Sequence, residues 1–179
     1  MALKDPKQAV CRFTDMRTLV LLTPLLALSA CDSRAPEPGP PLDPLAFFTG
    51  KSHGEATLSQ LFTADRHVAV DSVGRPQPDG SLSLTQRIAI QGKPPKIRQW
   101  LLRRDRPGYY SGTLTEATGP VDAATVGNSV RIRYKMKGGL KVEQWLAPLP
   151  GGKALDNQLE VTKLGIRVAS LHEVIRKLD

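Results

Sequence analysis

Apolar and polar residues alternate along several stretches of the chain after residue 44. In one stretch the apolar positions are Leu82, Leu84, Ile88 and Ile90, with Ser, Thr and Arg among the residues between them. In another they are Val130, Ile132, Tyr134 and Met136, and the alternate positions form a basic row of Arg131, Arg133, Lys135 and Lys137. Successive side chains of a strand point to opposite faces, so this period of two predicts half-buried strands. We expect the even-numbered side chains to face a core and the basic row to face solvent.

Turn signals divide this region into about ten short segments. Asp79-Gly80, Gly127-Asn128 and Gly138-Gly139 are typical of hairpin turns, and further Pro and Gly clusters separate other segments. The clearest predicted strands are residues 81–91, 96–104, 109–116, 129–137 and 140–147. A turn spacing of roughly 8–12 residues is typical of an all-β sandwich or barrel rather than of helices.

Two segments fit this scheme less well. Residues 167–179 place Val168, Leu171, Ile175 and Leu178 at helical spacing, so an amphipathic helix and a closing strand both fit them. Residues 45–48 suggest a short helical or irregular lead-in. We expect Phe47 and Phe48 to plug one end of the core.

An apolar stretch near the start has the profile of an export signal. Residues 19–30 are mostly Leu, Val and Ala, and Arg17 precedes them. About a dozen residues are too few for a membrane-spanning helix, which needs roughly 20. The stretch ends in Leu28-Ser29-Ala30-Cys31, which matches a lipobox, in which Leu28, Ser29 and Ala30 are read by the signal peptidase and the Cys31 thiol accepts diacylglycerol. We predict a lipoprotein-type signal peptide over residues 1–30, with the true start at Met1 or Met16.

The residues after Cys31 predict a tether. Residues 31–44 contain five prolines with Ser, Gly and charged residues, a composition typical of an extended, solvated linker. The expected domains are therefore a signal peptide (1–30), a lipidated Cys with a tether (31–44) and one β-barrel domain (45–179). The expected location is a membrane of a Gram-negative bacterium, with the barrel facing the periplasm. Inner and outer membrane both stay open.

Charge and cysteine content narrow the function classes. The chain carries a formal net charge of +8. Four of its 25 Lys and Arg residues and two of its 17 Asp and Glu residues fall within residues 1–30, which leaves 21 positive against 15 negative charges, or +6. Such a surplus suits nucleic acid or anionic lipid, and export argues against nucleic acid. The two cysteines are Cys11 and Cys31, so the expected barrel has no thiol for a disulfide or a metal.

Several short motifs resemble one protein family. They are, in order, Phe47-Phe48-Thr49-Gly50, Arg98-Gln99-Trp100, Tyr110-Ser111-Gly112-Thr113, Gly127-Asn128 ahead of Tyr134, and Thr162-Lys163-Leu164-Gly165-Ile166-Arg167-Val168. In order and spacing they resemble the proteobacterial lipoproteins grouped as domain of unknown function 3833, over nearly all of the chain after the tether. Gln144-Trp145-Leu146 departs from the D-W-M of that family, and Ala169 stands where a second Gly is usual. The resemblance implies a lipid anchor and a calycin-like or lipocalin-like, up-and-down antiparallel barrel of about 8–10 strands. It implies no reaction.

Residues that carry chemistry form no recognisable catalytic or metal pattern. The three histidines, His53, His67 and His172, are far apart in sequence, and no Ser lies in G-x-S-x-G. We therefore expect no catalytic residue, no metal ligand and no cofactor, and a protein that is not an enzyme.

Five residues are candidates for the lining of a ligand site: Arg98, Trp100, Tyr110, Tyr134 and Trp145. Arg98 shares strand parity with Trp100, so an inward Trp100 brings a guanidinium inside, which needs a carboxylate, an aromatic face or a ligand anion. Glu116 and Glu143 are the candidate partners for a purely structural ion pair.

Two function classes stay open at this point. One is a carrier that binds an apolar or amphipathic, lipid-like molecule inside the barrel. The other is a non-catalytic structural or assembly lipoprotein with a packed core and a protein partner. A cavity of a few hundred Å³ discriminates between them, because ligand pockets have roughly that volume.

Overall fold

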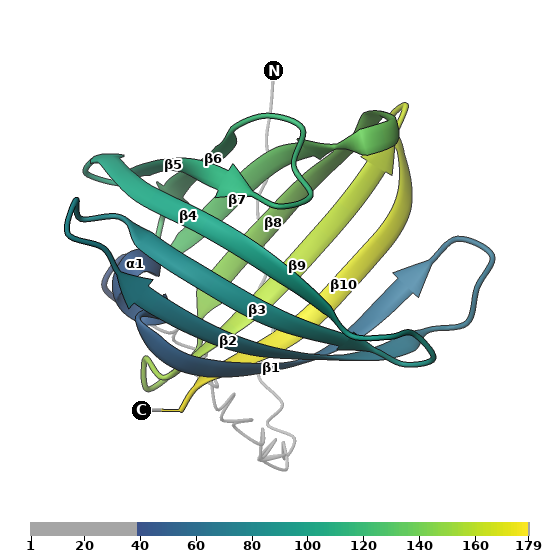
Figure 1. Ribbon diagram of the computed structural model, residues 1–179, viewed down its shortest axis with the longest axis horizontal. Coiled ribbons are helices and arrows are strands. Elements are labelled where there is room, and N and C mark those ends of the chain that lie inside the picture. Colours follow the sequence, from purple (N-terminus) through teal and green to yellow (C-terminus); the bar gives the residue numbers. More distant parts are fainter. Residues whose placement is uncertain (1–38, 179) are drawn as a thin grey trace, which may run out of the picture. The chain divides into compact units, whose positions relative to one another are not determined.

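The computed structural model describes residues 39–178 of the chain. The predicted signal peptide, Cys31 and most of the tether lie outside the described residues. The described part holds one short helix, α1 (Pro44–Phe48), and ten strands (Figure 1). The strands are β1 (Gly50–Gln60), β2 (Arg66–Pro76), β3 (Leu82–Ile90), β4 (Lys96–Arg106), β5 (Tyr109–Leu114), β6 (Val121–Val126), β7 (Ser129–Met136), β8 (Leu140–Pro148), β9 (Ala154–Lys163) and β10 (Ile166–Lys177). A 3₁₀ turn, η1 (Lys137–Gly139), joins β7 to β8.

The ten strands form a closed antiparallel barrel. Each strand pairs with its neighbours in sequence, and β10 pairs with β1, where Gly54 lies opposite Ile175. This confirms the predicted up-and-down, all-β architecture. Among the strands predicted by alternation, β3, β7 and β8 begin and end within one residue of expectation, and β4 continues two residues further.

The last segment is a strand rather than a helix. Residues 169–177 of β10 pair with β1, and residues 166–176 pair with β9 apart from one register shift between Arg167 and Ala169. These two ladders give the backbone of β10 hydrogen-bond partners on both sides. They therefore decide between the helix and the strand that the apolar spacing of residues 167–179 left open.

Helix α1 closes one end of the barrel, at the left in Figure 1. Asp43 caps its start by accepting a hydrogen bond from the Leu45 amide (3.1 Å). Phe47 and Phe48 are buried and pack edge to face, with ring centroids 5.1 Å apart. At the end of the helix, the Lys177 ammonium donates to the carbonyls of Phe47 (3.1 Å) and Thr49 (2.6 Å). The predicted plug formed by the two phenylalanines is confirmed.

Gly74 on β2 is where the plug meets the wall. A Cβ atom added at this position would lie 1.8 Å from the Phe48 carbonyl oxygen. Only a residue without a side chain therefore lets α1 approach the strand this closely.

The described barrel has the features of a domain that can fold on its own. It is one compact unit, its sheet closes on itself, and the buried apolar residues lie between Leu42 and Ile175. Because the described barrel is closed, each of its strands has a neighbouring strand on both sides. No helix within residues 39–178 is long and apolar enough to cross a membrane.

Candidate functional site: the barrel cavity

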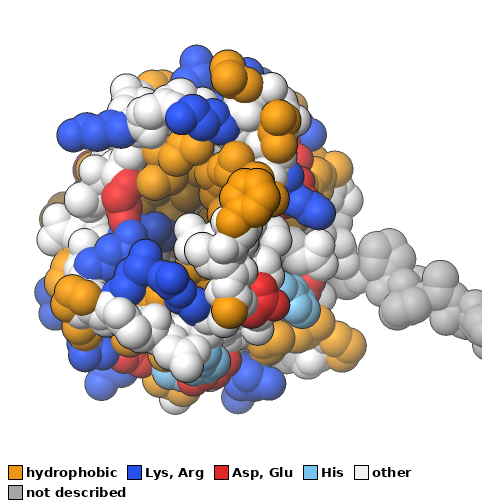
Figure 2. Space-filling model, turned by 90° about the vertical axis from the view of Figure 1, so that its right-hand side faces the viewer, with side chains coloured by type: hydrophobic (Ala, Val, Ile, Leu, Met, Phe, Trp, Pro, Cys, Tyr) orange, Lys and Arg blue, Asp and Glu red, His pale blue; other side chains and the backbone are white. Residues whose placement is uncertain are grey.

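The interior of the barrel contains a cavity of about 610 Å³. It extends from Phe48 of the plug to Leu61 and Thr63, which follow β1, and Lys93, which follows β3. Viewed from the end opposite α1, the molecule shows a hollow with apolar walls and basic side chains beside it (Figure 2). The alternative of a structural or assembly lipoprotein requires a packed interior, whereas this barrel contains a cavity.

The buried apolar residues form two clusters. The larger cluster includes Phe47 and Phe48 of the plug, and a smaller one, formed by Ala56, Val68, Val70 and Ile88, lies on β1, β2 and β3. Members of both clusters line the cavity, which gives it a mostly aliphatic wall. Such a wall suits an apolar chain or ring system.

Trp100 on β4 is held in the cavity wall by a chain of hydrogen bonds. Its indole Nε1 donates to Gln86 Oε1 (2.8 Å), and Gln86 Nε2 donates to Ser72 Oγ (3.2 Å). Its ring packs edge to face on Tyr134, with centroids 5.8 Å apart. Burial raises the pKa of the Tyr134 phenol, so Tyr134 stays neutral at physiological pH.

Arg98 brings a charge to the same wall. Its Nε donates to both carboxylate oxygens of Glu116 (3.1 and 2.9 Å), and the Lys96 ammonium donates to Glu116 as well (3.0 Å). Burial acts to raise the pKa of Glu116, but the charges of Arg98 and Lys96 outweigh it and lower that pKa. The predicted ion pair thus forms with Glu116. Glu143 instead accepts a hydrogen bond from Trp145 Nε1 (3.0 Å) on the outer face.

A second polar group lies on the opposite part of the wall, on β8, β9 and β10. Asn157 Nδ2 donates to Glu173 Oε2 (2.6 Å), and Gln144 is buried on the neighbouring strand. Among the described residues, Asn157 Oδ1 has no hydrogen-bond partner. Burial raises the pKa of Glu173, which favours its neutral form. Gly54 makes room for this carboxyl group, since an added Cβ would lie 1.8 Å from Glu173 Oε1.

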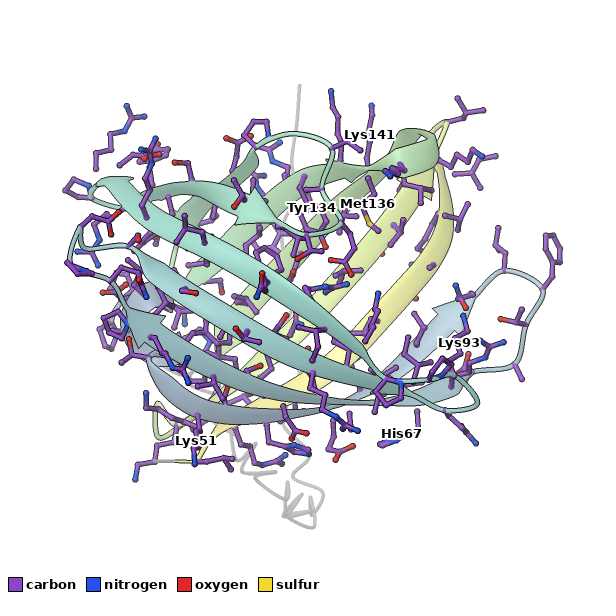
Figure 3. All side chains as sticks on the ribbon, viewed as in Figure 1. Lys51, His67, Lys93, Tyr134, Met136 and Lys141 are labelled. Carbon is purple, nitrogen blue, oxygen red and sulfur yellow. The ribbon has the colours of Figure 1, made fainter. Side chains whose placement is uncertain are left out.

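The charged residues that line the cavity are predominantly basic. They are Lys93, Lys96 and Arg98, against Glu173 alone, whose pKa is raised. Lys93 lies toward the open end of the barrel, as does Lys141, whereas Lys51 lies toward the plugged end (Figure 3). The entrance to the cavity therefore presents an environment that favours an anion.

The structure brings together three of the five candidate lining residues. Arg98, Trp100 and Tyr134 line the cavity. Tyr110 is buried on β5 but does not border this cavity, and the Arg104 guanidinium lies 5.7 Å from its ring centroid.

The prediction for Trp145 is wrong. Its neighbours Gln144 and Leu146 are buried and point inward, so strand parity turns Trp145 outward. There its ring lies 5.5 Å from the Arg131 guanidinium.

Sequence reasoning missed the polar residues Gln86, Gln144, Asn157 and Glu173. Strand parity could have identified two of them. Glu173 lies on the same strand face as Leu171 and Ile175, and Asn157 lies on the same face as Leu155 and Leu159. Within residues 39–178, no group of three or more His, Cys, Asp or Glu side chains is placed to hold a metal ion. His53 and His67 instead contact Glu55, at 2.6 and 2.5 Å.

The fold and the cavity define the class of protein: a lipocalin-like antiparallel barrel with an internal cavity that opens at one end. The chain belongs to the family described as "Protein of unknown function (DUF3833)", whose model matches residues 25–177. This confirms the family that the motifs resemble, whereas the lipid anchor stays a prediction. No curated protein matches the sequence.

Three solved structures share the fold at low sequence identity. The S-type phycobiliprotein lyase CPES from Guillardia theta has a TM-score of 0.57 at 6% identity, over 75% of this chain and 91% of its own. A protein of unknown function from the DUF3598 family of Nostoc punctiforme has a TM-score of 0.57 at 10% identity, over 80% of this chain and 53% of its own. The Rv2717c protein of M. tuberculosis has a TM-score of 0.50 at 15% identity, over 77% of this chain and 99% of its own. At these identities the likeness concerns the fold alone.

Proposed function

We propose that this protein binds one amphipathic molecule with an anionic head group inside its barrel and carries it at a membrane. The observation that supports this most is a cavity of about 610 Å³ with aliphatic walls and three cationic lining residues. Two of them, Lys96 and Arg98, share the single carboxylate of Glu116, so the wall keeps a surplus of positive charge. Its volume falls within the range of about 300–1,000 Å³ that is typical of small-molecule sites. The lipocalin-like fold supports the proposal further, because barrels of this size can hold one small molecule.

Arg98 is the residue proposed to receive the head group. Glu116 occupies its Nε, whereas its two terminal NH₂ groups form no hydrogen bond with the residues that the structure describes. A carboxylate or phosphate binds well to such a planar pair of donors. Lys96 adds a second charge beside it, and the aliphatic wall receives the apolar part of the molecule.

The proposed location follows from the start of the sequence. Lipidation of Cys31 would hold the protein on a membrane that faces the periplasm of a Gram-negative bacterium, with no catalytic role, cofactor or nucleic-acid partner. A lipid-anchored protein of this kind meets amphipathic molecules at the membrane surface.

Binding of a matched pair of probes tests the proposal. The probes are a pyrene-labelled fatty acid and the alcohol of the same chain length, titrated into the fragment 36–179. The carboxylate is expected to bind saturably and at least tenfold more tightly than the alcohol, which corresponds to about 1.4 kcal/mol.

Substitution of Arg98 separates the head-group site from the apolar wall. Arg98→Met combined with Glu116→Gln, which leaves no unpaired carboxylate, is expected to reduce the preference for the carboxylate, because Lys96 alone remains to attract it, and to leave binding of the alcohol unchanged. The control is Arg103→Met, which alters an exposed residue of the same strand. Absence of saturable binding, or equal affinity of the unmodified fragment for both probes, would contradict the proposal.

A further inference from the structure

Two turns at the open end of the barrel expose large apolar side chains. Phe62, in the connection between β1 and β2, is 100% exposed, and Leu164, in the turn between β9 and β10, is 94% exposed. Their neighbours Leu61 and Ile166 are exposed as well. The first turn follows β1 and the second precedes β10, and these two strands pair with each other. Leu61 N donates to Val168 O (3.1 Å) across this pair. Both lie at the end opposite α1 (Figure 1).

Phe62 and Leu164 also share an unfavourable backbone conformation. Their φ angles are 63° and 51°, and they are the two non-glycine residues with positive φ within residues 39–178. This region of φ favours Gly and Asn, and it is costly for bulky residues. Leu164 and Gly165, both at positive φ, form the two-residue loop of the β9–β10 hairpin, a position where Asn-Gly is the preferred sequence.

The turns at the plugged end provide the contrast. Asp79-Gly80, Gly127-Asn128 and Gly151-Gly152 are built from small or polar turn residues. At the open end, two turns instead combine a strained backbone with an apolar side chain that packs against nothing in the described barrel. Neither feature stabilises the fold, so both are expected to serve contact with something outside it.

Charge at the open end points to what that contact is. Lys93, Lys137 and Lys163 lie in or beside three of its turns. The turns at this end contain two acidic residues, Asp65 and Glu116, and Glu116 is already paired with Lys96 and Arg98. Apolar tips surrounded by lysines are complementary to an anionic lipid bilayer, in which acyl chains lie beneath negative head groups.

We infer that the open end of the barrel docks on an anionic bilayer, with Phe62 and Leu164 inserted among the acyl chains. Lys93, Lys137 and Lys163 then face the lipid head groups, and the mouth of the cavity lies on the membrane. This docking requires neither a ligand in the cavity nor lipidation of Cys31, so failure of either leaves it standing.

Chain length is compatible with docking of a protein anchored at Cys31. The described chain enters the barrel at the plugged end, so an anchored protein must reach past the height of the barrel. The eleven residues from Cys31 to Leu42 span at most about 36–40 Å. A strand of eleven residues is about 36 Å long and its tilt makes the barrel shorter than that.

Flotation of the unanchored fragment 36–179 with lipid vesicles tests the inference. The vesicles contain phosphatidylcholine alone or phosphatidylcholine with phosphatidylglycerol. The fragment is expected to bind the phosphatidylglycerol vesicles at least fivefold more tightly, and Phe62→Ser with Leu164→Asn is expected to weaken that binding at least tenfold. The matched control is Leu101→Ser with Val126→Ser, which removes two exposed apolar side chains away from the mouth and is expected to change binding less than twofold.

A stability measurement separates docking from a structural role. Because Leu164→Asn suits the positive φ of its turn, the double variant is expected to unfold at the same temperature as the unmodified fragment or above it. Three results would overturn the inference. They are no binding of the unmodified fragment, an equal loss of binding in both double variants, and binding that persists without Phe62 and Leu164 and is lost only when salt is added.

Discussion

Leu155 and Leu159 lie on the same face of β9, four residues apart, but in different surroundings. Leu155 is fully buried in the larger apolar cluster and does not border the cavity, whereas Leu159 lines it. Substitution of each by Trp therefore adds the same volume to packed core in one case and to the border of a cavity of about 610 Å³ in the other. Comparison of the two variants therefore measures whether the barrel interior can hold a larger side chain.

The structure sets the expected magnitudes. Overpacking at Leu155 is expected to cost about 1–3 kcal/mol of unfolding free energy. At Leu159 the larger side chain gains roughly 50 Å² of buried apolar surface, or about 1.2 kcal/mol at ~25 cal/mol per Å², which offsets its lost rotamer freedom. We expect Leu159→Trp to change stability by less than about 1 kcal/mol, so that Leu155→Trp is the more destabilising variant, by about 2 kcal/mol at the middle of its range.

Guanidinium unfolding of the fragment 36–179, followed by circular dichroism, measures both values. Circular dichroism is preferred because the substitutions alter tryptophan fluorescence directly. Leu159→Trp is also expected to lower the affinity for the fatty-acid probe, because it occupies the space of the ligand. Equal destabilisation by the two substitutions would refute the reasoning, since it would mean that side chains already fill the barrel.

Three further predictions concern the plug, the buried carboxyl group and the anchor. Gly74→Ala is expected to cost about 1–3 kcal/mol, because its Cβ collides with the Phe48 carbonyl, and thermal unfolding measures the loss. Glu173→Gln is expected to stabilise the barrel increasingly as pH rises above 4.5, the ordinary pKa of a glutamic acid. Above pH 4.5 the unfolded chain loses the proton of Glu173, whereas burial makes the folded chain keep it. The unmodified protein therefore loses stability until the pH passes the raised pKa of Glu173. An effect of Glu173→Gln that is the same at pH 4 and pH 8 would contradict this. Cys31→Ser is expected to abolish incorporation of labelled lipid into the full-length protein and to prevent processing of the signal peptide, and unchanged labelling would contradict the predicted anchor.

Alternation and turn residues were sufficient to predict most of the barrel. The strands around Leu84 and Ile132 have one clearly apolar face, and Gly-containing turns mark their ends, so local sequence and tertiary structure agree. The segment 167–179 is different, because a register shift between Arg167 and Ala169 interrupts its alternation and leaves an apolar spacing that resembles a helix. Only its pairing with β1 and β9 decides its structure.

The candidate site was predictable only in part. Arg98 and Trp100 were found because they share parity on one strand. Trp145 was misplaced because apolar residues occupy positions 145, 146 and 147 in succession, while the inward position 144 holds a glutamine. Alternation fails where an interior position is polar, and cavity-lining residues are often of this kind.

The volume of the cavity and the exposure of Phe62 could not be predicted from the sequence. A cavity depends on how side chains from all ten strands fill the same space, which no local pattern records. Similarly, a phenylalanine in a connecting segment gives no sign that it is fully exposed at positive φ.

Native mass spectrometry of the full-length protein, extracted from its own membranes in mild detergent, tests the central claim most directly. We predict one additional small molecule per chain, with an acidic group, that is lost when the protein is denatured. A bare protein mass, unchanged after addition of total lipid extract, would contradict the account of this barrel as a carrier.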